Sequence, residues 1–433
     1  MKRYSEYKDS GVKWIGEIPG HWKTPKLNRV VSKVGSGSTP RGGSEVYIDE
    51  GIKFLRSQNI HFEGLNLDSV VYIPDSINEQ MKNTQVQPFD VLLNITGGSI
   101  GRCFYVDDTL GKANVNQHVC IIRPLSVNYR FLKYFLQSNS GQSQVWFYQK
   151  GDREGLSAES IKTFRLPLPP LPEQEAIVTY LDSKVAKIDE YIAIAEKKIA
   201  ALEELKQTII AEAVTRGIHK DVPMKDSGVK WIGMIPEHWN MLRAKNIFER
   251  QFRPVRDCDE VVTCFRDGQV TLRKNRRIEG FTESLKEIGY QGIRKGDLVI
   301  HQMDAFAGSI GVSDSDGKGT PVYICCLPKD YKNINVYFYA YLLREMARSG
   351  FIKSLYRGIR ERSSDFRFDT FSVQWLPLVP IKEQNEIVTY IEEKVANINQ
   401  LCQAERSQIE KLKEYKQRLI SDVVTGKVKV TND

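Results

Sequence analysis

Several arginine-rich stretches carry side chains that could contact nucleic acid. The second half of the chain contains RAKNIFERQFRPVR, TLRKNRR and LYRGIRERSSDFRF, and the first half contains the milder GSTPRGG, FLRSQNI and QKGDREG. Arginine neutralises backbone phosphates and pairs bidentately with guanine, while asparagine and glutamine can read adenine. A solvated charged surface explains any single arginine equally well. For the clusters Arg273–Arg277 and Arg357–Arg367 we favour phosphate contact.

The candidate contact residues lie beside glycine-rich turns or at strand ends, where loops could enter a groove. In the first half they are Thr39, Arg41, Arg56, Gln58, Asn59, Asn94, Thr96, Arg102, Asn116, Gln117 and Arg153. In the second half they are Arg266, Arg273, Lys274, Arg276, Arg277, Gln302, Asp304, Arg357, Arg360, Arg362 and Arg367. Asp304 could accept a hydrogen bond from cytosine, but a capping or turn role is equally consistent. Trp14 and Trp231 are expected to be packing anchors rather than base-stacking groups.

The sequence contains no motif that supports an enzyme class. A GxxxxGK[ST] phosphate loop and a GxSxG elbow are both missing, and GSGSTP at Gly35–Pro40 lacks the third glycine of a dinucleotide fingerprint. The NPPY or DPPY tetrapeptide of adenine methyltransferases does not occur. Seven cysteines without a CxxC pair and six scattered histidines disfavour disulfides and a metal site. We therefore expect a non-catalytic chain with reduced core thiols.

The composition is typical of a globular protein of two or three domains. The chain has 433 residues, of which 41% are hydrophobic and 27% charged. No apolar run approaches the roughly 20 residues that span a bilayer, and the N-terminus has no signal-peptide pattern. We expect a cytoplasmic protein without membrane contact. The net charge is +8, but the two helical tails described below carry −4 between them, so the excess positive charge lies elsewhere.

The chain is internally duplicated. KDSGVKWIGEIPGHW from Lys8 returns as KDSGVKWIGMIPEHW from Lys225, and PLPEQEAIVTYLDSKVAKID from Pro170 returns as PIKEQNEIVTYIEEKVANIN from Pro380. A shorter pair, DVLLNITGGSIG from Asp90 and DLVIHQMDAFAGSIG from Asp297, lies between them. The intervening segments barely resemble one another. This pattern predicts two lobes on one frame, each tuned to a different target.

The matching tails have an apolar residue at every third or fourth position, which predicts two long amphipathic helices. Each would run about 40 residues, or roughly 60 Å, which is longer than a lobe of this size. The helices should therefore pack on each other as an antiparallel coiled coil. Such packing would bring the two chain termini together and give the molecule a pseudo-two-fold axis.

Short apolar runs bounded by glycine, proline and asparagine predict strand-rich lobes. VVYIP, DVLLNI, HVCIIRP and VVTCF are expected strands, and YRFLKYFLQS and VYFYAYLLREMARSGFI are expected helices. The predicted fold is α+β, with two mixed α/β recognition domains separated by the two long helices. The expected boundaries are 1–168 for the first recognition domain, 169–217 for the first spacer helix, 218–378 for the second recognition domain, and 379–433 for the second spacer helix and C-terminal tail.

The repeated KDSGVKWIG-IP-HW segments, the D-L-GSIG cores, the proline-rich helix entries and the paired helices together resemble the specificity subunit of type I restriction–modification systems. The resemblance covers essentially the whole chain. It implies that each lobe is a target recognition domain for one half of a split double-stranded DNA sequence. It also implies that the helices set the half-site spacing and dock two modification (methyltransferase) subunits.

The same resemblance places the chemistry in partner subunits. Modification subunits would bind S-adenosylmethionine, restriction subunits would use ATP and Mg²⁺ to cut DNA, and this chain would hold no cofactor. The candidate partner-binding residues are six apolar side chains of the helical stripes: Ile188, Ile192, Leu202, Ile398, Ile409 and Leu412. The alternative is a stand-alone DNA-binding scaffold or regulator, whose long helices would pair with a second copy of the chain.

Overall fold

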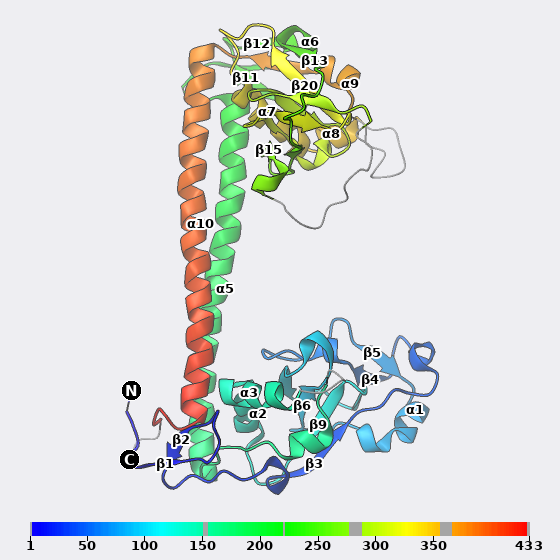
Figure 1. Ribbon diagram of the computed structural model, residues 1–433, viewed down its shortest axis with the longest axis vertical. Helices are drawn as coiled ribbons and strands as arrows, with labels where there is room; N and C mark the ends of the chain where they lie inside the picture. The colour runs from blue at the N-terminus through cyan, green and yellow to red at the C-terminus, as the bar shows by residue number, and fades with distance from the viewer. Residues whose placement is uncertain (1, 150–154, 220, 277–287, 356–365, 431–433) are drawn as a thin grey trace. The chain divides into compact units, whose positions relative to one another are not determined.

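The computed structural model describes residues 2–149, 155–219, 221–276, 288–355 and 366–430. The chain divides into two compact units, Met1–Glu196 with Arg406–Asp433, and Lys197–Glu405. Each unit contains a short hairpin, a strand-rich lobe, the first part of one long helix and the last part of the other (Figure 1). The duplication seen in the sequence is therefore also a duplication of structure.

The first lobe is built on a four-stranded antiparallel sheet and a smaller three-stranded sheet. The larger sheet has the order β3 (Val31–Ser36), β9 (Val119–Pro124), β6 (Val91–Asn94) and β7 (Cys103–Tyr105). The smaller has the order β5 (Val71–Ile73), β4 (Ile52–Leu55) and β8 (Ala113–Val115), with β4 and β8 parallel. The helices are α1 (Asp75–Gln80), α2 (Tyr129–Gln137), α3 (Asn139–Tyr148) and α4 (Ala158–Lys162). Every residue of β6 is buried, which explains its unbroken apolar run.

The second lobe repeats this central sheet with different residues. Its order is β13 (Phe248–Gln251), β20 (Tyr323–Pro328), β17 (Leu298–His301) and β18 (Ile310–Val312). Two further pairs are β14 (Val262–Cys264) with β15 (Val270–Leu272), and β16 (Gln291–Ile293) with β19 (Gly317–Gly319). The helices are α6 (Ala244–Ile247), α7 (Val336–Arg348), α8 (Phe351–Ser354) and α9 (Phe368–Ser372). The predicted strands and the predicted helix of the first lobe are confirmed. The helix predicted over 336–352 is interrupted at Gly350, whose φ of 79° separates α7 from α8.

Two neighbouring chain segments connect each lobe to its hairpin and its long helix. In the first unit, bridges join Lys23 to Leu168 and Lys26 to Arg165. In the second, strand β12 (Asn240–Arg243) pairs with β21 (Trp375–Leu378). The chain therefore enters and leaves each lobe at one place, between the hairpin and the start of the long helix.

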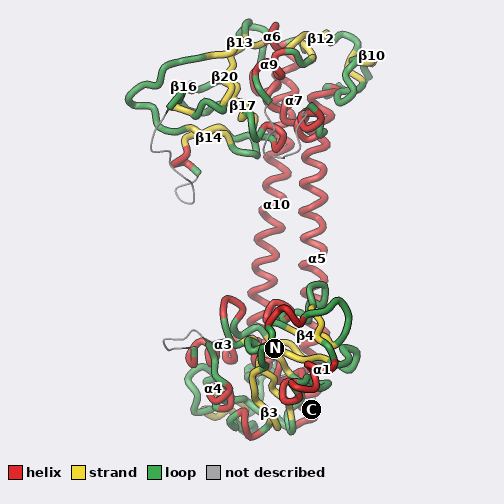
Figure 2. The backbone as a smooth tube through the Cα atoms, turned by 90° about the vertical axis from the view of Figure 1, so that its right-hand side faces the viewer, coloured by secondary structure: helices red, strands yellow, loops and turns green. Residues whose placement is uncertain are grey.

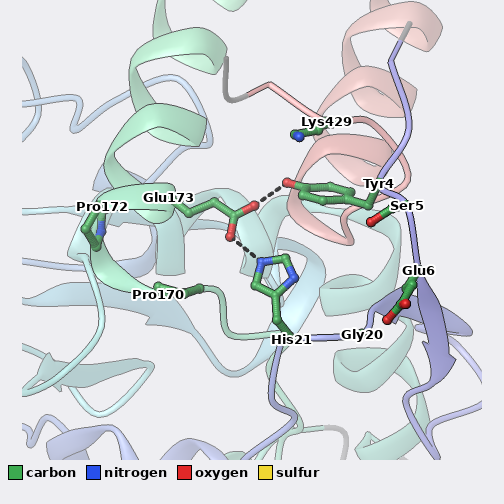
Figure 3. Close-up of a pocket in the computed structure, with 9 residues that line it drawn as sticks. All are labelled: Tyr4, Ser5, Glu6, Gly20, His21, Pro170, Pro172, Glu173 and Lys429. Atoms are coloured by element: carbon green, nitrogen blue, oxygen red, sulfur yellow. Dashed lines mark hydrogen bonds and ion pairs between the residues drawn. The ribbon is translucent and has the colours of Figure 1, made fainter. Parts of the chain in front are cut away.

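In each unit, the repeated hairpin is hydrogen-bonded to a buried glutamate in the first turn of the long helix. There are two such hairpins. They comprise β1 (Tyr7–Asp9) with β2 (Glu17–Pro19), and β10 (Met224–Asp226) with β11 (Met234–Pro236). Glu173 accepts hydrogen bonds from the indole Nε1 of Trp22 at 3.1 Å, from His21 Nε2 at 2.9 Å and from the Tyr4 hydroxyl. Figure 3 shows His21 and Tyr4 converging on this carboxylate at a pocket of about 470 Å³.

The second hairpin uses the same fastening. Glu383 accepts from Trp239 Nε1 at 3.0 Å and from His238 Nε2 at 2.8 Å. Since an unpaired buried indole N–H is costly, each buried tryptophan needs the glutamate that accepts its hydrogen bond. The half-buried Trp14 and Trp231 pack on Phe147 and Phe351, with ring centroids 5.0 and 6.0 Å apart, as expected of packing anchors.

The two long helices are α5 (Leu171–Arg216) and α10 (Ile381–Val424), of 46 and 44 residues. Pro172 lies in the first turn of α5, and Gly217 and Gly426 follow the helix ends with positive φ values of 77° and 75°. In the second unit Lys198 contacts Glu405, and Lys206 Nζ donates to Asn399 Oδ1 at 3.2 Å, so the helices are antiparallel. Figures 1 and 2 show them side by side, which confirms the predicted pairing. None of the helices in the described ranges has a stretch apolar enough to cross a membrane.

The two ends of the chain meet in the first unit. The backbone N–H of Lys429 donates to the carbonyl of Lys2 at 2.9 Å, and the Tyr7 hydroxyl donates to the carbonyl of Gly426 at 3.0 Å. The expectation that the termini lie together is confirmed.

The cysteines follow the expected pattern with one exception. Six of the seven are buried, and burial raises the pKa of the Cys103 thiol to about 12. Cys258 is exposed, so the interpretation of all seven as core thiols is wrong at this position. Cys258 lies in the segment between β13 and β14, where no strand repeat forces the side chain inward.

Candidate nucleic-acid interface

In the first lobe, the predicted contact residues gather where four loops meet at the ends of the strands. Asn94, at the end of β6, donates from Nδ2 to the carbonyl of Ser57 at 2.7 Å. The backbone N–H of Asn116 donates to Leu55 at 3.1 Å. Gly37 completes the contact, because a Cβ there would lie 2.2 Å from the carbonyl oxygen of Val115. The glycine of the GSGSTP loop thus permits a close backbone approach.

The buried members of this set shape the loops. The others present polar side chains at the surface of these loops, which we call the candidate edge of the first lobe. Asn59 is fully buried: its Oδ1 accepts from Arg56 N and its Nδ2 donates to the carbonyl of Asn66, both at 2.9 Å. The other buried members are Asn94 and Asn116, the half-buried ones are Arg56, Thr96 and Arg102, and the exposed ones are Thr39, Arg41, Gln58 and Gln117. The same residue types therefore serve both loop structure and the polar edge.

His118 belongs to this edge but escaped the sequence analysis. Its Nδ1 lies 2.6 Å from Thr96 Oγ1, and its Nε2 lies 2.9 Å from Gln117 Nε2. A lone histidine before a buried strand gives no signal of such a role. The bonds fix the orientation of two predicted contact residues relative to each other.

In the second lobe, the turn between β14 and β15 packs on the loop that contains the repeated GSIG sequence. A Cβ on Gly311 would lie 1.9 Å from the carbonyl oxygen of Gly268, and one on Gly308 would lie 2.8 Å from that of Arg266. Arg266 Nη2 donates to Asp304 Oδ1 at 3.0 Å across this contact. In the second lobe a side chain at either glycine would push this turn away.

The basic residues that follow β15 are held in fixed positions by carboxylates, a hydroxyl group and an aromatic ring. Arg276 donates to Asp267 at 2.8 Å and lies over the Phe265 ring at 4.3 Å. The hydrogen bond from Arg276 lowers the pKa of the Asp267 carboxyl, so this ion pair persists into mildly acidic solution. Lys274 pairs with Glu260 at 2.5 Å, and Arg273 Nε donates to Thr263 Oγ1 at 3.5 Å.

Asp304 and Gln302 lie at the same edge but already have partners. Asp304 accepts from Arg266 and its carbonyl accepts from Ala307 N at 2.9 Å, which supports the turn role. A cytosine amino group would have to compete with Arg266 for the carboxylate. Gln302 donates weakly to the carbonyl of Pro321 at 3.3 Å, and Arg367 is exposed beyond it.

Five predicted contact residues lie outside the described residues: Arg153, Arg277, Arg357, Arg360 and Arg362. The described residues that flank two of these segments contact the candidate edges. Gly155 bridges to Thr96 in the first lobe, and Phe366 N donates to the carbonyl of Gln302 at 3.0 Å in the second.

The six predicted partner-binding residues lie on the seam between α5 and α10. Ile188, Ile398 and Ile409 are buried, and Ile192, Leu202 and Leu412 are half-buried. The Lys416–Asp189 ion pair, at 2.7 Å, lies along the same seam in the first unit. The two helices cover these side chains at least in part, and their contact with a partner protein stays a prediction.

Both edges combine arginine, amide and hydroxyl side chains on glycine-rich loops, an arrangement that suits phosphate and base contact rather than covalent chemistry. In the described part of the chain, no three His, Cys, Asp or Glu side chains are grouped to hold a metal ion.

Comparison with known proteins gives consistent matches. The model of the "Type I restriction modification DNA specificity domain" family matches residues 19–204. The putative type I restriction enzyme MjaX specificity subunit of Methanocaldococcus jannaschii is 22% identical over 98% of both chains. The EcoBI specificity subunit of Escherichia coli is 24% identical over 79% of this chain and 74% of its own.

Two solved structures share the fold. A chain from work on complex assembly and conformational transition of the type I R-M system gives a TM-score of 0.68 at 16% identity, covering 94% of this chain and 98% of that one. The HsdS subunit from Thermoanaerobacter tengcongensis gives 0.55 at 16% identity, covering 95% and 98%.

Proposed function

Because the chain belongs to the family of DNA specificity subunits of type I restriction–modification systems, we propose that each lobe reads one half of a split, asymmetric DNA target. The family is non-catalytic. On this proposal, residues 1–168 and 218–378 are the two target recognition domains, and 169–217 and 379–433 contain the spacer helices. The paired helices set the distance between the two half-sites.

The observation that carries this proposal is that both lobes contain the same sheet but expose different side chains at the candidate edge. The sheet order β3-β9-β6-β7 of the first lobe is repeated as β13-β20-β17-β18 in the second, each with a GSIG loop. The first edge presents Gln58, Thr96 and Gln117, whereas the second presents Arg266 and Arg276. Two lobes with the same sheet and different exposed polar groups fit two domains that recognise different DNA sequences.

Exchange of the first lobe tests the proposal. The bridge between Lys23 and Leu168 marks the neck, so residues 24–167 can be replaced by the corresponding segment of another family member without cutting the hairpin or α5. We expect one half of the methylated motif to change completely and the other half and the spacer to stay the same. Methylome sequencing of strains with the parent chain, the exchanged chain and no chain measures this. A motif that changes in both halves, or in neither, would contradict the proposal.

We propose that two identical modification subunits dock on the outer faces of the helices near their starts. Packing explains why buried residues match between α5 and α10, but it does not explain matching exposed ones. Thr179 and Lys184 are exposed, as are their counterparts Thr389 and Lys394. The two lysines lie over Tyr180 and Tyr390 at 5.7 and 5.5 Å. Two matching exposed surfaces fit two copies of one partner.

Charge reversal at these lysines tests the docking surface. We expect the double variant Lys184→Glu and Lys394→Glu to weaken assembly with the modification subunits about tenfold or more, since it replaces attraction by repulsion at both surfaces. Co-purification and analytical ultracentrifugation measure this. Lys197→Glu is the matched control, because Lys197 is exposed on α5 and its counterpart in the repeat is Ser407. Equal assembly of the double variant and the control would refute the assignment.

The partners would supply the chemistry, with S-adenosylmethionine in the modification subunits and ATP and Mg²⁺ in restriction subunits. The stand-alone regulator is less well supported, because α5 and α10 already cover each other's apolar stripes within one chain. A free homodimer that binds one sequence tightly without partners would favour the regulator.

A further inference from the structure

The second lobe contains a cavity of about 380 Å³ lined by three arginines, of which only Arg266 was singled out from the sequence. Arg344 and Arg348 come from α7, and Arg266 from the β14–β15 turn. The GSIG loop closes one wall with Phe306, and α5 closes another with Gln207 and Ile210. All of these residues belong to one compact unit.

Arg344 is the unusual member of this group. Its Nε is fully buried and has no hydrogen-bond partner among the described residues. Gly268, in the β14–β15 turn with φ of +89°, makes room for it: a Cβ there would lie 2.7 Å from the Cδ, Nε and Cζ of Arg344. Burial of this N–H without a hydrogen-bond acceptor costs about 1–3 kcal/mol. The nearest carboxylate that attracts this cation is Asp267, which is already hydrogen-bonded to Arg276.

The nearby carboxylates are already occupied. Glu345 accepts two hydrogen bonds from Arg348, each 2.7 Å long. Asp304 accepts from Arg266 at 3.0 Å, and Asp267 from Arg276 at 2.8 Å. Within the described residues each of these three acids has its own arginine. The cavity lining, with three arginines and one glutamate, carries excess positive charge.

The first lobe shows that the fold does not require this charge. Asn128 caps α2 and Asn335 caps α7, each accepting from the backbone two residues on. Counted from these caps, Gln137 takes the place of Arg344 and Ser138 the place of Glu345. Gln137 is buried and neutral in a lobe with the same central sheet. The arginine is thus particular to the second lobe.

We propose that the cavity of Arg266, Arg344 and Arg348 binds a phosphate group, and that this group is a backbone phosphate of the DNA held by the second lobe. The proposal rests on the DNA-reading function proposed above. The forked guanidinium group matches two phosphate oxygens at once, and Arg266 joins the cavity to the candidate edge at Asp304. Because phosphate contacts position a duplex without reading it, this site sets where the second lobe sits on its half-site.

The test uses the full chain and a duplex that carries its methylation motif. We expect Arg344→Gln, which installs the first lobe's residue, to weaken binding about tenfold, as for loss of one charged hydrogen bond. The slope of log K against log salt should fall by about one, and the preferred motif should not change. Fluorescence anisotropy over a salt series measures both. Arg344→Lys keeps the charge and loses the forked guanidinium group, so its DNA affinity should lie between those of the parent chain and Arg344→Gln. This variant replaces Arg344→Gln in the test if the glutamine variant does not fold.

Lys332→Gln is the charge-matched control. Lys332 is exposed in the turn before α7, whereas Arg344 lies towards the other end of that helix. If both variants lower the slope equally, or if Arg344→Gln binds DNA like the parent chain, the DNA assignment is overturned. A parent chain that binds no DNA would instead refute the proposed function itself, before the variants are compared.

Two further measurements separate other sources of the anion. Thermal unfolding with inorganic phosphate tests a free ion: stabilisation of the parent chain but not of Arg344→Gln, with equal DNA binding by both, would mean that the cavity takes free phosphate rather than DNA. Weaker assembly of Arg344→Gln with modification subunits, again with unchanged DNA binding, would mean that an acidic side chain of a partner fills the cavity. Either outcome overturns the proposal.

Discussion

Replacing Asp90 by alanine is expected to destabilise the first lobe by about 3 kcal/mol, because it leaves the half-buried Arg123 without its counter-charge. Asp90 is fully buried. Its two carboxylate oxygens accept from Arg123 Nε at 2.7 Å and Nη2 at 2.8 Å, and from the backbone of Gln87 at 2.7 Å. Urea unfolding followed by circular dichroism should show the unfolding midpoint of this unit moving to lower denaturant.

Two further variants show whether pairing is the cause. Asp75→Ala removes an exposed carboxylate 3.9 Å from Lys112 and should change stability little. The double variant Asp90→Leu with Arg123→Leu should recover much of the loss, since apolar replacement of a whole buried ion pair is often tolerated. If Asp90→Ala is as mild as Asp75→Ala, the ion pair does not stabilise the lobe.

The same ion pair shows what the sequence could and could not reveal. Asp297, the repeated counterpart of Asp90, is also buried and accepts from Arg253 at 2.6 and 3.1 Å. The repeat predicts that both aspartates have one role. It does not predict their partners, because Arg123 lies in β9 whereas Arg253 follows β13. Different strands of the same sheet supply the arginine, so no sequence spacing is common to the two pairs.

The long-range architecture was predictable because it depends on periodicity. Apolar residues recur along α5 and α10 over more than ten turns, and a glycine follows each helix. A helical signal of this length is not reversed by contacts with the rest of the protein. The sheets of the two lobes were predictable only as a class. Their order is set by pairings between strands that are distant in sequence, such as β3 with β9.

The candidate interface was harder to predict because residue type does not reveal burial. Asn59 and Gln58 are neighbours of similar chemistry, yet one is fully buried and shapes the loop while the other is exposed. Arg344 was missed for the opposite reason. It stands in an amphipathic helix, where an arginine is usually a solvated residue, and only the cavity and Gly268 reveal that its Nε is buried.

Lengthening both helices by one turn is expected to lengthen the DNA spacer and leave both half-sites unchanged. The insertions must lie opposite each other. Leu202 matches Leu412 in the repeat, but the antiparallel helices do not place them together. Leu202 lies between Lys198, which contacts Glu405, and Lys206, which contacts Asn399, so it faces the α10 segment around Cys402.

Four residues should therefore be inserted after Leu202 and four after Leu401. Four helical residues add about 6 Å, which corresponds to about two base pairs of DNA. Methylome sequencing should show the motif with its spacer longer by that amount. Insertion into α5 alone is the control: it shifts the stripe of one helix against the other, and we expect methylation to be lost rather than moved to a longer site. An unchanged spacer in the doubly extended chain would mean that the helices hold the lobes together without setting the distance that they read.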